Sequence, residues 1–174
     1  MPVPPENIEM DINKPKELVI EKILSVLRYQ CGYEVLGILL EDSNNVRIQF
    51  SNKTGRIRQV FYKKKRFLSY KPHVGRFAFS LNSAILIHSE LEAPALRVKV
   101  LTDIQEFIKK GRSVFSKHVI SIDKRLRPQD EVLVVNQQDE LLAIGKLLIP
   151  PKYYHGLDGG VAVDVKKGIK KLKK

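Results

Sequence analysis

The strongest periodic pattern in the chain lies near its start, where apolar residues recur every three or four positions. The residues that share this stripe are Ile20, Ile23, Leu24, Leu27 and Cys31. Asn13 is placed to cap a helix, Pro15 is tolerated in its first turn, and Gly32 is placed to end it. The pattern therefore predicts a helix over residues 15–31. A second short apolar piece, YEVLGILL, follows.

The next part of the chain alternates apolar and polar residues with a period of two, which is typical of strands. The runs are NVRIQF, RIRQVFY and KKKRFLSY, and the turn residues SNKTG separate the first two. Ile57 and Val60 fall on opposite phases of the second run, so we expect a bulge or a slipped register. The runs predict a small antiparallel sheet with one basic face. After Ser80 or Asn82, FSLNSAILIHSEL predicts a short helix that ends before Pro94.

From Leu96 onward, short strands dominate the pattern. The segments that predict strands are LRVKVL, KHVISI, EVLVVN, LLAIGKLLI and VAVDV. Between the first two, TDIQEFIKK predicts a short helix capped by Thr102 and ended by Gly111. Gly145, inside a strand, indicates a bulge or a close approach of backbone. DKRLRPQD and QQDE are turns, and PPKYYHGLDGG is a loop with a helical turn. Closely spaced strands of this kind predict a small barrel, with a domain boundary near residue 95.

Composition limits the class of protein. The chain has 174 residues, of which 43% are apolar, an ordinary fraction for a folded protein. Cys31 is the only cysteine, so we expect neither an internal disulfide nor a cysteine-based zinc site. The start, MPVPPENIEM, lacks the basic residues and apolar run of a signal peptide. No apolar segment approaches the roughly 18 residues that span a membrane, and we expect a cytoplasmic protein.

The charge is large and unevenly distributed. Thirty-one Lys and Arg face nineteen Asp and Glu, a formal net charge of +12. Residues 1–42 hold eight acids and four bases, whereas residues 51–76 hold nine bases and no acid. The last nine residues hold six lysines. Segregated positive charge of this size indicates an anionic partner, most commonly nucleic acid. The alternative is a basic protein from a lysine-rich proteome.

Residues that could carry catalysis do not gather in any known spacing. The histidines are scattered at His73, His88, His118 and His155, without the spacing of a metal site. The chain has no glycine-rich phosphate loop and no nucleophile elbow. We therefore expect no catalytic residue, no metal and no cofactor in this chain.

Aromatic residues stand between the charges of the predicted sheet. They are Phe61, Tyr62, Phe67 and Tyr70, among Lys63, Lys64, Lys65, Arg66 and Lys71. Such aromatics can stack on unpaired bases while the cations neutralise phosphates. The alternative is that they form the buried face of the sheet.

Longer motifs resemble a known family. FIKKGRSVFSKHVISIDKRLRPQDEVLVVNQQDELLAIGKLLI and GGVAVDVKKG place their glycines, an Arg-Pro turn and strands in the order of a PUA domain, an RNA-binding pseudo-barrel. This form is similar to the one that ends the archaeosine tRNA-guanine transglycosylases and the related archaeosine synthases. The first half, above all SNKTGRIRQV, resembles the small domain that precedes the PUA domain in those enzymes.

The resemblance implies an α+β protein with a small α/β domain, built on an antiparallel sheet, before a PUA-type β pseudo-barrel. The implied parts are a flexible arm at 1–14, a C2-like domain at 15–95, a PUA domain at 96–168 and a basic tail at 169–174. The family's catalytic barrel, with its aspartates and its zinc site, has no counterpart in this sequence. A separate zinc-binding barrel subunit is therefore the expected protein partner, in a hetero-oligomer.

In this family the PUA domain grips the acceptor stem and 3′ end of tRNA, and the preceding domain helps to hold the tRNA body. Matching motifs carry the RNA-binding role to Lys53, Arg56, Arg58, Arg112, Ser113, Phe115, Lys117 and Gly145, and their neighbours Lys110 and Lys146 complete the candidate site. Two departures concern loops. Residues 127–130 read Arg-Pro-Gln-Asp instead of Arg-Pro-Gly-Asp, and residues 158–160 read Asp-Gly-Gly where a basic residue before glycine is common.

The segment GRSVFSKHV combines two roles in this interpretation. We expect Val114, Phe115 and Val119 to pack inside the barrel, whereas Arg112 and Lys117 face RNA. The alternative is that both charges are merely solvated. The leading hypothesis is the tRNA-binding subunit of a split archaeosine transglycosylase, which serves a D-arm guanine. The alternatives are a stand-alone PUA protein of ribosome assembly or translation and an accessory chain of archaeosine synthase.

Overall fold

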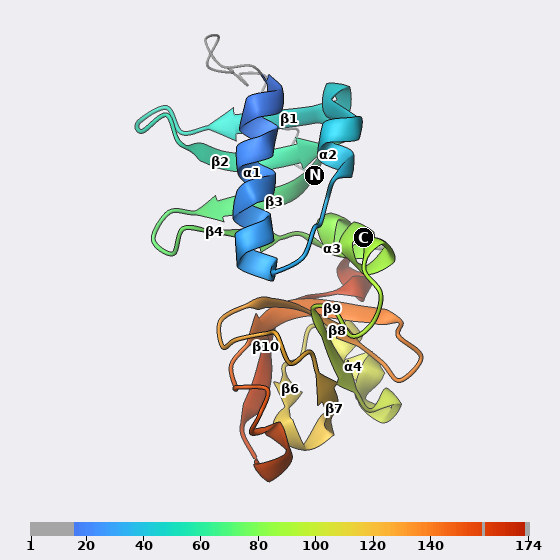
Figure 1. The fold of residues 1–174 in the computed structure, drawn as a ribbon. Coiled ribbons are helices and arrows are strands. Elements are labelled where there is room, and N and C mark those ends of the chain that lie inside the picture. Colours follow the sequence, from blue (N-terminus) through green and yellow to red (C-terminus); the bar gives the residue numbers. More distant parts are fainter. Residues whose placement is uncertain (1–15, 158, 173–174) are drawn as a thin grey trace. The chain divides into compact units, whose positions relative to one another are not determined.

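The computed structural model describes residues 16–157 and 159–172, which form two compact units (Figure 1). The first unit ends at Ser83 and the second begins at Ala84, within helix α3 (Leu81–Glu90). The domain boundary near residue 95 stays a prediction. The arm predicted at 1–14 lies outside the described residues. In this part of the chain, no helix is long and apolar enough to cross a membrane.

The first unit is a four-stranded antiparallel sheet with a long helix across it (Figure 1). Its helical elements are α1 (Lys16–Cys31), the short α2 (Ile38–Glu41) and the 3-10 turn η1 (Ser43–Asn45). Its strands are, in sheet order, β1 (Val46–Phe50), β2 (Ile57–Tyr62), β3 (Lys65–Lys71) and β4 (Arg76–Phe79).

Helix α1 confirms the prediction from the apolar stripe. Ile20, Ile23 and Leu27 are at most 1% exposed, because the stripe faces the core. Asn13, the predicted cap, and Pro15 lie outside the described residues. Gln30, also buried, donates from Nε2 to the Phe77 carbonyl (2.8 Å) and accepts from the Phe77 amide (2.9 Å). This pair of hydrogen bonds fixes the end of α1 to β4.

The three predicted strands of the first unit are confirmed, and the fourth, β4, was not predicted. The expected irregularity in the second run is also present. The register of β2 against β3 shifts between Val60 and Phe61, and that of β1 against β2 shifts between Gln49 and Phe50. Near these bulges Val60, Phe61 and Tyr62 are all buried, whereas Ile57 is only half-buried.

The second unit is a nearly closed barrel of six strands. Its strands are β5 (Arg97–Val100), β6 (Val114–Phe115), β7 (Val119–Ile122), β8 (Glu131–Val135), β9 (Leu141–Leu147) and β10 (Val161–Gly168). The helical elements are η2 (Thr102–Ile104), α4 (Gln105–Lys109), η3 (Ser116–His118), η4 (Tyr154–Gly156) and η5 (Ile169–Leu172).

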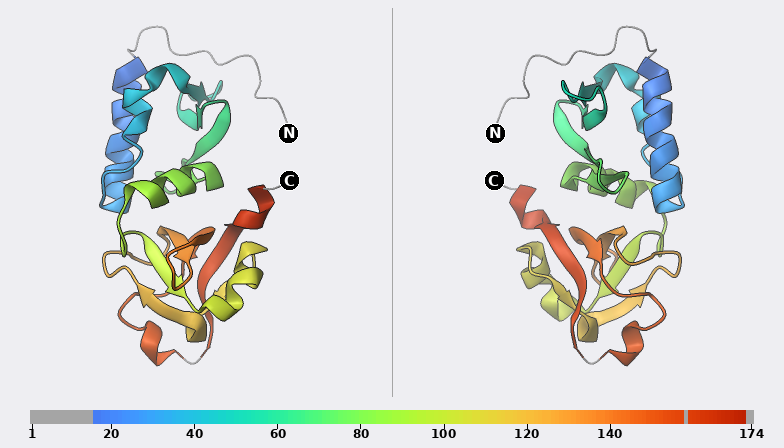
Figure 2. Two further views of the ribbon diagram at one scale, coloured as in Figure 1. Left: turned by 90° about the vertical axis from the view of Figure 1, so that its right-hand side faces the viewer. Right: turned by 90° about the vertical axis from the view of Figure 1, so that its left-hand side faces the viewer.

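The strand order β6-β10-β9-β8-β5-β7 explains the barrel shape (Figure 2). β6 and β7 are consecutive in the chain, yet they lie at opposite ends of this order, so the sheet curls until its two ends meet around η3. β5 and β8 pair in parallel, whereas the other pairs are antiparallel. Every residue of β8 is buried, which matches its continuous apolar run.

Three details of the predicted second half are corrected. Thr102 does not cap the helix: it begins the 3-10 turn η2, and its hydroxyl contacts Gln137 Oε1 (3.0 Å). In KHVISI the first two residues belong to η3, and the strand begins at Val119. The two-residue strand β6 was not predicted, because two residues are too few to show a period.

Gly145 confirms the predicted close approach. A Cβ at this position would lie 2.5 Å from the Asp164 carbonyl oxygen and 2.7 Å from Val163 Cγ1. The register of β10 against β9 also shifts near this point, between Val165 and Lys167. Only glycine lets the two strands approach so closely, so Gly145 has a structural role in the barrel.

Candidate nucleic-acid interface

Three of the predicted RNA-binding cations lie in and beside the turn between β1 and β2. Backbone hydrogen bonds from the Ser51 amide to Arg56 O (2.8 Å) and from the Gly55 amide to Ser51 O (2.8 Å) close this turn. Gly55 has a φ of 62°, which glycine adopts without strain. Lys53, Arg56 and Arg58 are exposed, and they have no ion-pair partner within the described residues. Their charges are therefore available to an external anion.

The hairpin between β2 and β3 carries further cations. Its two turn residues, Lys63 and Lys64, both have positive φ, 47° and 64°. Lys63 Nζ lies 3.8 Å from Asp42 Oδ2 and 5.1 Å from the centre of the Tyr62 ring, and the Tyr62 hydroxyl donates to the same Asp42 oxygen (2.8 Å). Hydrogen bonds from Asn45 and Tyr62 hold the pKa of Asp42 below its ordinary value. Lys63 is thus tied to a carboxylate of its own unit.

Of the two interpretations of the sheet aromatics, burial is confirmed for three of the four. Phe61, Tyr62 and Phe67 are 9%, 8% and 4% exposed, and the Tyr62 and Phe67 rings meet edge to face with centres 5.2 Å apart. Tyr70 is half-buried against Phe77. Three of the aromatics are therefore buried and not available to stack on bases. Phe61 is buried on the face that carries the exposed Arg47 and Arg66, and these cations are groups that the sheet presents to solvent.

In the second unit, the segment GRSVFSKHV brings several predicted residues to the surface. Arg112 and Lys117 are exposed, as expected, and Val114 is fully buried. Phe115 corrects the expectation that it packs in the barrel, because it is 49% exposed. Within β6 successive side chains point to opposite faces, so a buried Val114 places Phe115 outside. Val119 is only half-buried.

The end of α4 positions the start of this segment. The Gly111 amide donates to Ile108 O (2.8 Å) and the Arg112 amide donates to Phe107 O (3.1 Å), which closes the last turn. Gly111 has a φ of 96°, so the chain turns sharply between Lys110 and Arg112. Both cations are exposed on the two sides of this turn. Phe107, 61% exposed on α4, was not predicted as a surface residue.

Lys146 lies in a more balanced electrostatic environment than the sequence suggests. In the register of the barrel it pairs with Glu131 of β8 and with Asp164 of β10. Lys146 Nζ also approaches Gln129 Oε1 (3.4 Å), and the Ser113 hydroxyl approaches Asp164 Oδ1 (3.5 Å). These carboxylates offset the positive charge near Gly145, so the attraction for phosphate concentrates at Lys110, Arg112 and Lys117.

The loop before β10 contacts the GRSVFSKHV segment. The Ser116 amide donates to Gly160 O (3.0 Å), and the Tyr154 hydroxyl donates to Ile120 O (2.8 Å). These bonds hold the loop beside η3 and leave Tyr153, 64% exposed, at the surface. This loop was predicted, but Tyr153 was not predicted as a surface residue. The paired tyrosines of PPKYYHG are the signal that could have drawn attention to it.

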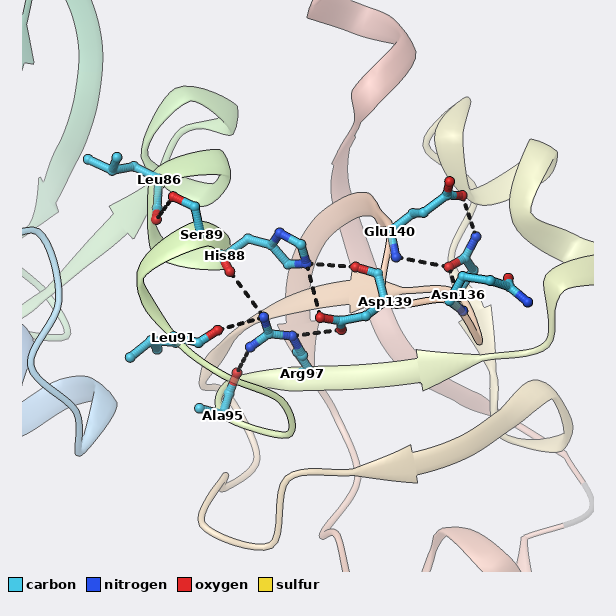
Figure 3. Close-up of polar contacts among 10 residues, drawn as sticks. Leu86, His88, Ser89, Leu91, Ala95, Arg97, Asn136, Asp139 and Glu140 are labelled. Carbon is cyan, nitrogen blue, oxygen red and sulfur yellow. Dashed lines mark hydrogen bonds and ion pairs between the residues drawn. The ribbon is translucent and has the colours of Figure 1, made fainter.

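A buried arginine joins α3 to the barrel (Figure 3). Arg97 is 4% exposed, and its guanidinium donates to the carbonyls of Ala95 (3.0 Å), His88 (3.0 Å) and Leu91 (2.7 Å). Its Nε donates to Asp139 Oδ1 (2.8 Å). His88 Nε2 lies 2.7 Å from the Asp139 carbonyl, to which it can only donate. This cluster is structural: Arg97 binds the carbonyls at the end of α3 and is not available to RNA.

Part of the predicted basic tail is also engaged. Residues 169–172 form η5, and Lys170 makes an ion pair with Glu106 of the segment Gln105–Lys109. Hydrogen bonds from Lys170 and Lys109 hold the pKa of Glu106 below its ordinary value. The last two lysines lie outside the described residues.

Comparison with known proteins identifies the two parts of the chain. Residues 21–94 match the patch-forming domain C2 of tRNA-guanine transglycosylase, and residues 97–169 match the PUA domain. The tRNA-guanine(15) transglycosylase of Thermococcus onnurineus is 35% identical over 164 residues, which is 94% of this chain and 28% of the relative. That of Methanococcus vannielii is 36% identical over 149 residues, 86% of this chain and 22% of the relative.

A solved structure shows the same fold. A conserved PUA domain protein from Thermoplasma acidophilum superimposes with a TM-score of 0.59 at 15% identity, covering 89% of this chain and 91% of that one. The chain thus carries a C2 domain followed by a PUA domain, and the predicted α+β fold is confirmed. It spans about a quarter of the length of the curated relatives that it matches (28% and 22%).

Proposed function

We propose that this chain, with its C2 and PUA domains in the order found in tRNA-guanine(15) transglycosylases, is the tRNA-binding subunit of such an enzyme. The observation that carries the proposal is the extent of the match, which covers 94% of the chain in one relative. The exposed cations of both units support it, because unpaired Lys and Arg neutralise phosphates.

In this proposal a partner chain supplies the catalytic barrel. The partner would hold the zinc ion and the acid–base groups and exchange a D-arm guanine for a 7-deazaguanine base. The chain described here would bind no cofactor and would hold the tRNA so that the target base is accessible. The two proteins would form a hetero-oligomer in the cytoplasm. A stand-alone PUA protein and an accessory chain of archaeosine synthase are the alternatives.

The test of this proposal is reconstitution. We expect the purified chain alone to exchange no labelled guanine into tRNA. A transglycosylase barrel from the same genome that ends without a PUA domain should exchange faster when this chain is added. Exchange by the chain alone would contradict the non-catalytic role. Tight tRNA binding without any effect on the barrel would favour a stand-alone RNA-binding protein.

Arg112 and Lys117 are expected to distinguish the 3′ end of tRNA from the rest of the molecule. Proteins read folded RNA by its shape, backbone and single-stranded ends, and the CCA end is such an end. Changing both residues to alanine should weaken tRNA binding by about 1–3 kcal/mol, the range for charge-assisted hydrogen bonds. Folding should be unaffected, because both side chains are exposed.

The measurement compares intact tRNA with tRNA that lacks its 3′ end, for the wild type and the double variant. We expect the wild type to prefer the intact end and the variant to lose this preference. Equal weakening for both RNAs would reduce the two residues to general electrostatics. A matched control, Lys22→Ala with Lys124→Ala, removes two exposed lysines from other surfaces of the two units.

A further inference from the structure

The hairpin between β2 and β3 is unusual in its turn residues. Tyr62 pairs with Lys65, so Lys63 and Lys64 form a two-residue turn, and both have positive φ (47° and 64°). This geometry favours Asn-Gly and similar pairs, because a side chain with a Cβ is strained in the left-handed region. Two lysines at these positions therefore cost stability relative to the residues that the turn prefers.

Of the other non-glycine residues with positive φ, three have contacts that explain their conformation, and the exposed Gln129 (φ 76°) has a side-chain hydrogen bond from Lys146 Nζ (3.4 Å). Leu36 and Leu96 are at most 1% exposed, so packing holds them in place. Asp139 is held by Arg97 and His88. For Lys64, in contrast, the described residues offer no side-chain partner, and the side chain is exposed. A strained residue that packing does not explain is a candidate for function.

The strand register brings more cations beside this turn. Arg47 of β1 pairs with Phe61 of β2, and Phe61 pairs with Arg66 of β3, so the two arginines flank one buried aromatic on the same face. Since neighbouring strands lie about 4.8 Å apart, their Cα atoms are separated by about 10 Å. Lys64 lies in the turn, and Lys65 pairs with Tyr62, so its side chain points to the other face of the sheet from Arg66. These four exposed cations surround this end of the hairpin and lack ion-pair partners among the described residues.

We name these four residues (Arg47, Lys64, Lys65 and Arg66) the hairpin cluster. We propose that the hairpin cluster binds the phosphate backbone of RNA. This site is separate from the GRSVFSKHV segment and from the turn at residues 51–58. The inference rests on the proposed tRNA-binding function and adds a contact surface to it. Lys63 is excluded from the cluster, because its ammonium group is paired with Asp42. The cluster has no base-reading group, since its aromatic neighbours are buried, so it contributes affinity without sequence preference.

The turn strain makes a sharp test possible, because the substitutions that remove the charges also suit the backbone. The hairpin variant is Lys64→Gly with Lys65→Thr and Arg66→Thr: glycine relieves the positive φ, and threonine favours strands. The matched control, Lys16→Gln with Lys22→Gln and Lys124→Gln, removes three charges outside the hairpin that have no ion-pair partner among the described residues. Binding of a structured tRNA is measured at several salt concentrations, and the thermal midpoint of each protein is recorded.

We expect the slope of log affinity against log salt to become shallower by about two to three units in the hairpin variant, since each lost phosphate contact removes about 0.7–0.9. Affinity at low salt should fall at least about tenfold, and the control should change neither quantity. The thermal midpoint of the single variant Lys64→Gly should be equal to or above that of the wild type. A lower midpoint would overturn the argument from strain.

Two other outcomes separate this inference from the proposed function. If the wild type binds tRNA with a steep salt dependence and the hairpin variant matches the control, the hairpin inference is wrong and the tRNA-binding function stands. If the wild type does not bind tRNA, the proposed function itself fails. The hairpin variant could instead keep its affinity for tRNA and lose binding to the catalytic partner chain. That result would show that the hairpin cluster binds the partner protein, and it would overturn the RNA contact.

Discussion

Replacing Arg97 with methionine is expected to lower the free energy of unfolding of the second unit by about 3–5 kcal/mol. The guanidinium is buried and donates to three backbone carbonyls and to Asp139. Methionine fills much of the same volume but donates no hydrogen bond, so buried acceptors at the end of α3 lose their partners. Each such loss costs about 1–3 kcal/mol, and the Asp139 carboxylate loses its ion pair as well.

The control for this variant is Lys99→Met, two residues further along β5. Lys99 is half-exposed and has no ion-pair partner among the described residues, so its replacement should change stability by about 0.5 kcal/mol or less. Urea unfolding, followed by circular dichroism, measures both variants. Equal midpoints for Arg97→Met and Lys99→Met would show that the bonds that Arg97 makes in Figure 3 contribute nothing to stability.

Local periodicity accounts for the parts of the fold that the sequence predicted. Helix α1 follows from its apolar stripe, and the long strands follow from alternation or from continuous apolar runs. The family motifs added the order of the two domains. What the sequence could not predict depends on pairing between distant segments. The parallel pairing of β5 with β8 and the bonds between Gln30 and Phe77 have no signal in either segment alone.

Phe115 shows why part of the candidate site was misjudged. The sequence offered Val114, Phe115 and Val119 as a set of core residues because all three are apolar. The structure places the first two side by side in β6, where adjacent side chains must point to opposite faces, and places Val119 at the start of β7. Once residues 114 and 115 are known to form a strand, the exposure of Phe115 follows from the burial of Val114. The missing information was the strand itself.

Arg97 was missed for a different physical reason. In LRVKVL the alternation of side chains does not indicate that Arg97 is buried, and an arginine is usually exposed. Its burial depends on carbonyl groups at the end of α3 and on a turn about forty residues later, at Asp139 (a sequence separation of 42). The balance of charge around Lys146 has the same origin, because Glu131 and Asp164 come from two other strands.

The affinity of this chain for tRNA is expected to fall steeply with salt, by roughly a thousandfold between about 50 mM and 200 mM if six phosphates are neutralised. The exposed cations without ion-pair partners in the described chain make this expectation specific: three lie at the β1–β2 turn, four in the hairpin cluster, and others at Lys110, Arg112 and Lys117. Each phosphate contact releases counterions that were bound to the RNA. Their release contributes less to the free energy of binding as the salt concentration rises. Fluorescence anisotropy with labelled tRNA over a salt series measures the slope. An affinity that stays constant from low to high salt would contradict a basic-surface mechanism.

Removing residues 169–174 should weaken this binding without changing which RNA is preferred, because phosphate contacts position a protein and do not read sequence. The segment holds four lysines, and one of them, Lys170, is already paired with Glu106. The salt slope should therefore fall by about two to three units, at 0.7–0.9 for each lysine other than Lys170, and not by the value for four. The matched control is Glu106→Gln in the full chain, which releases both Lys170 and Lys109 from their ion pairs and should steepen the slope by up to about two units. A truncated chain that loses its preference for intact tRNA would show that the tail reads the RNA end directly, and Arg112 and Lys117 would no longer suffice to explain that preference.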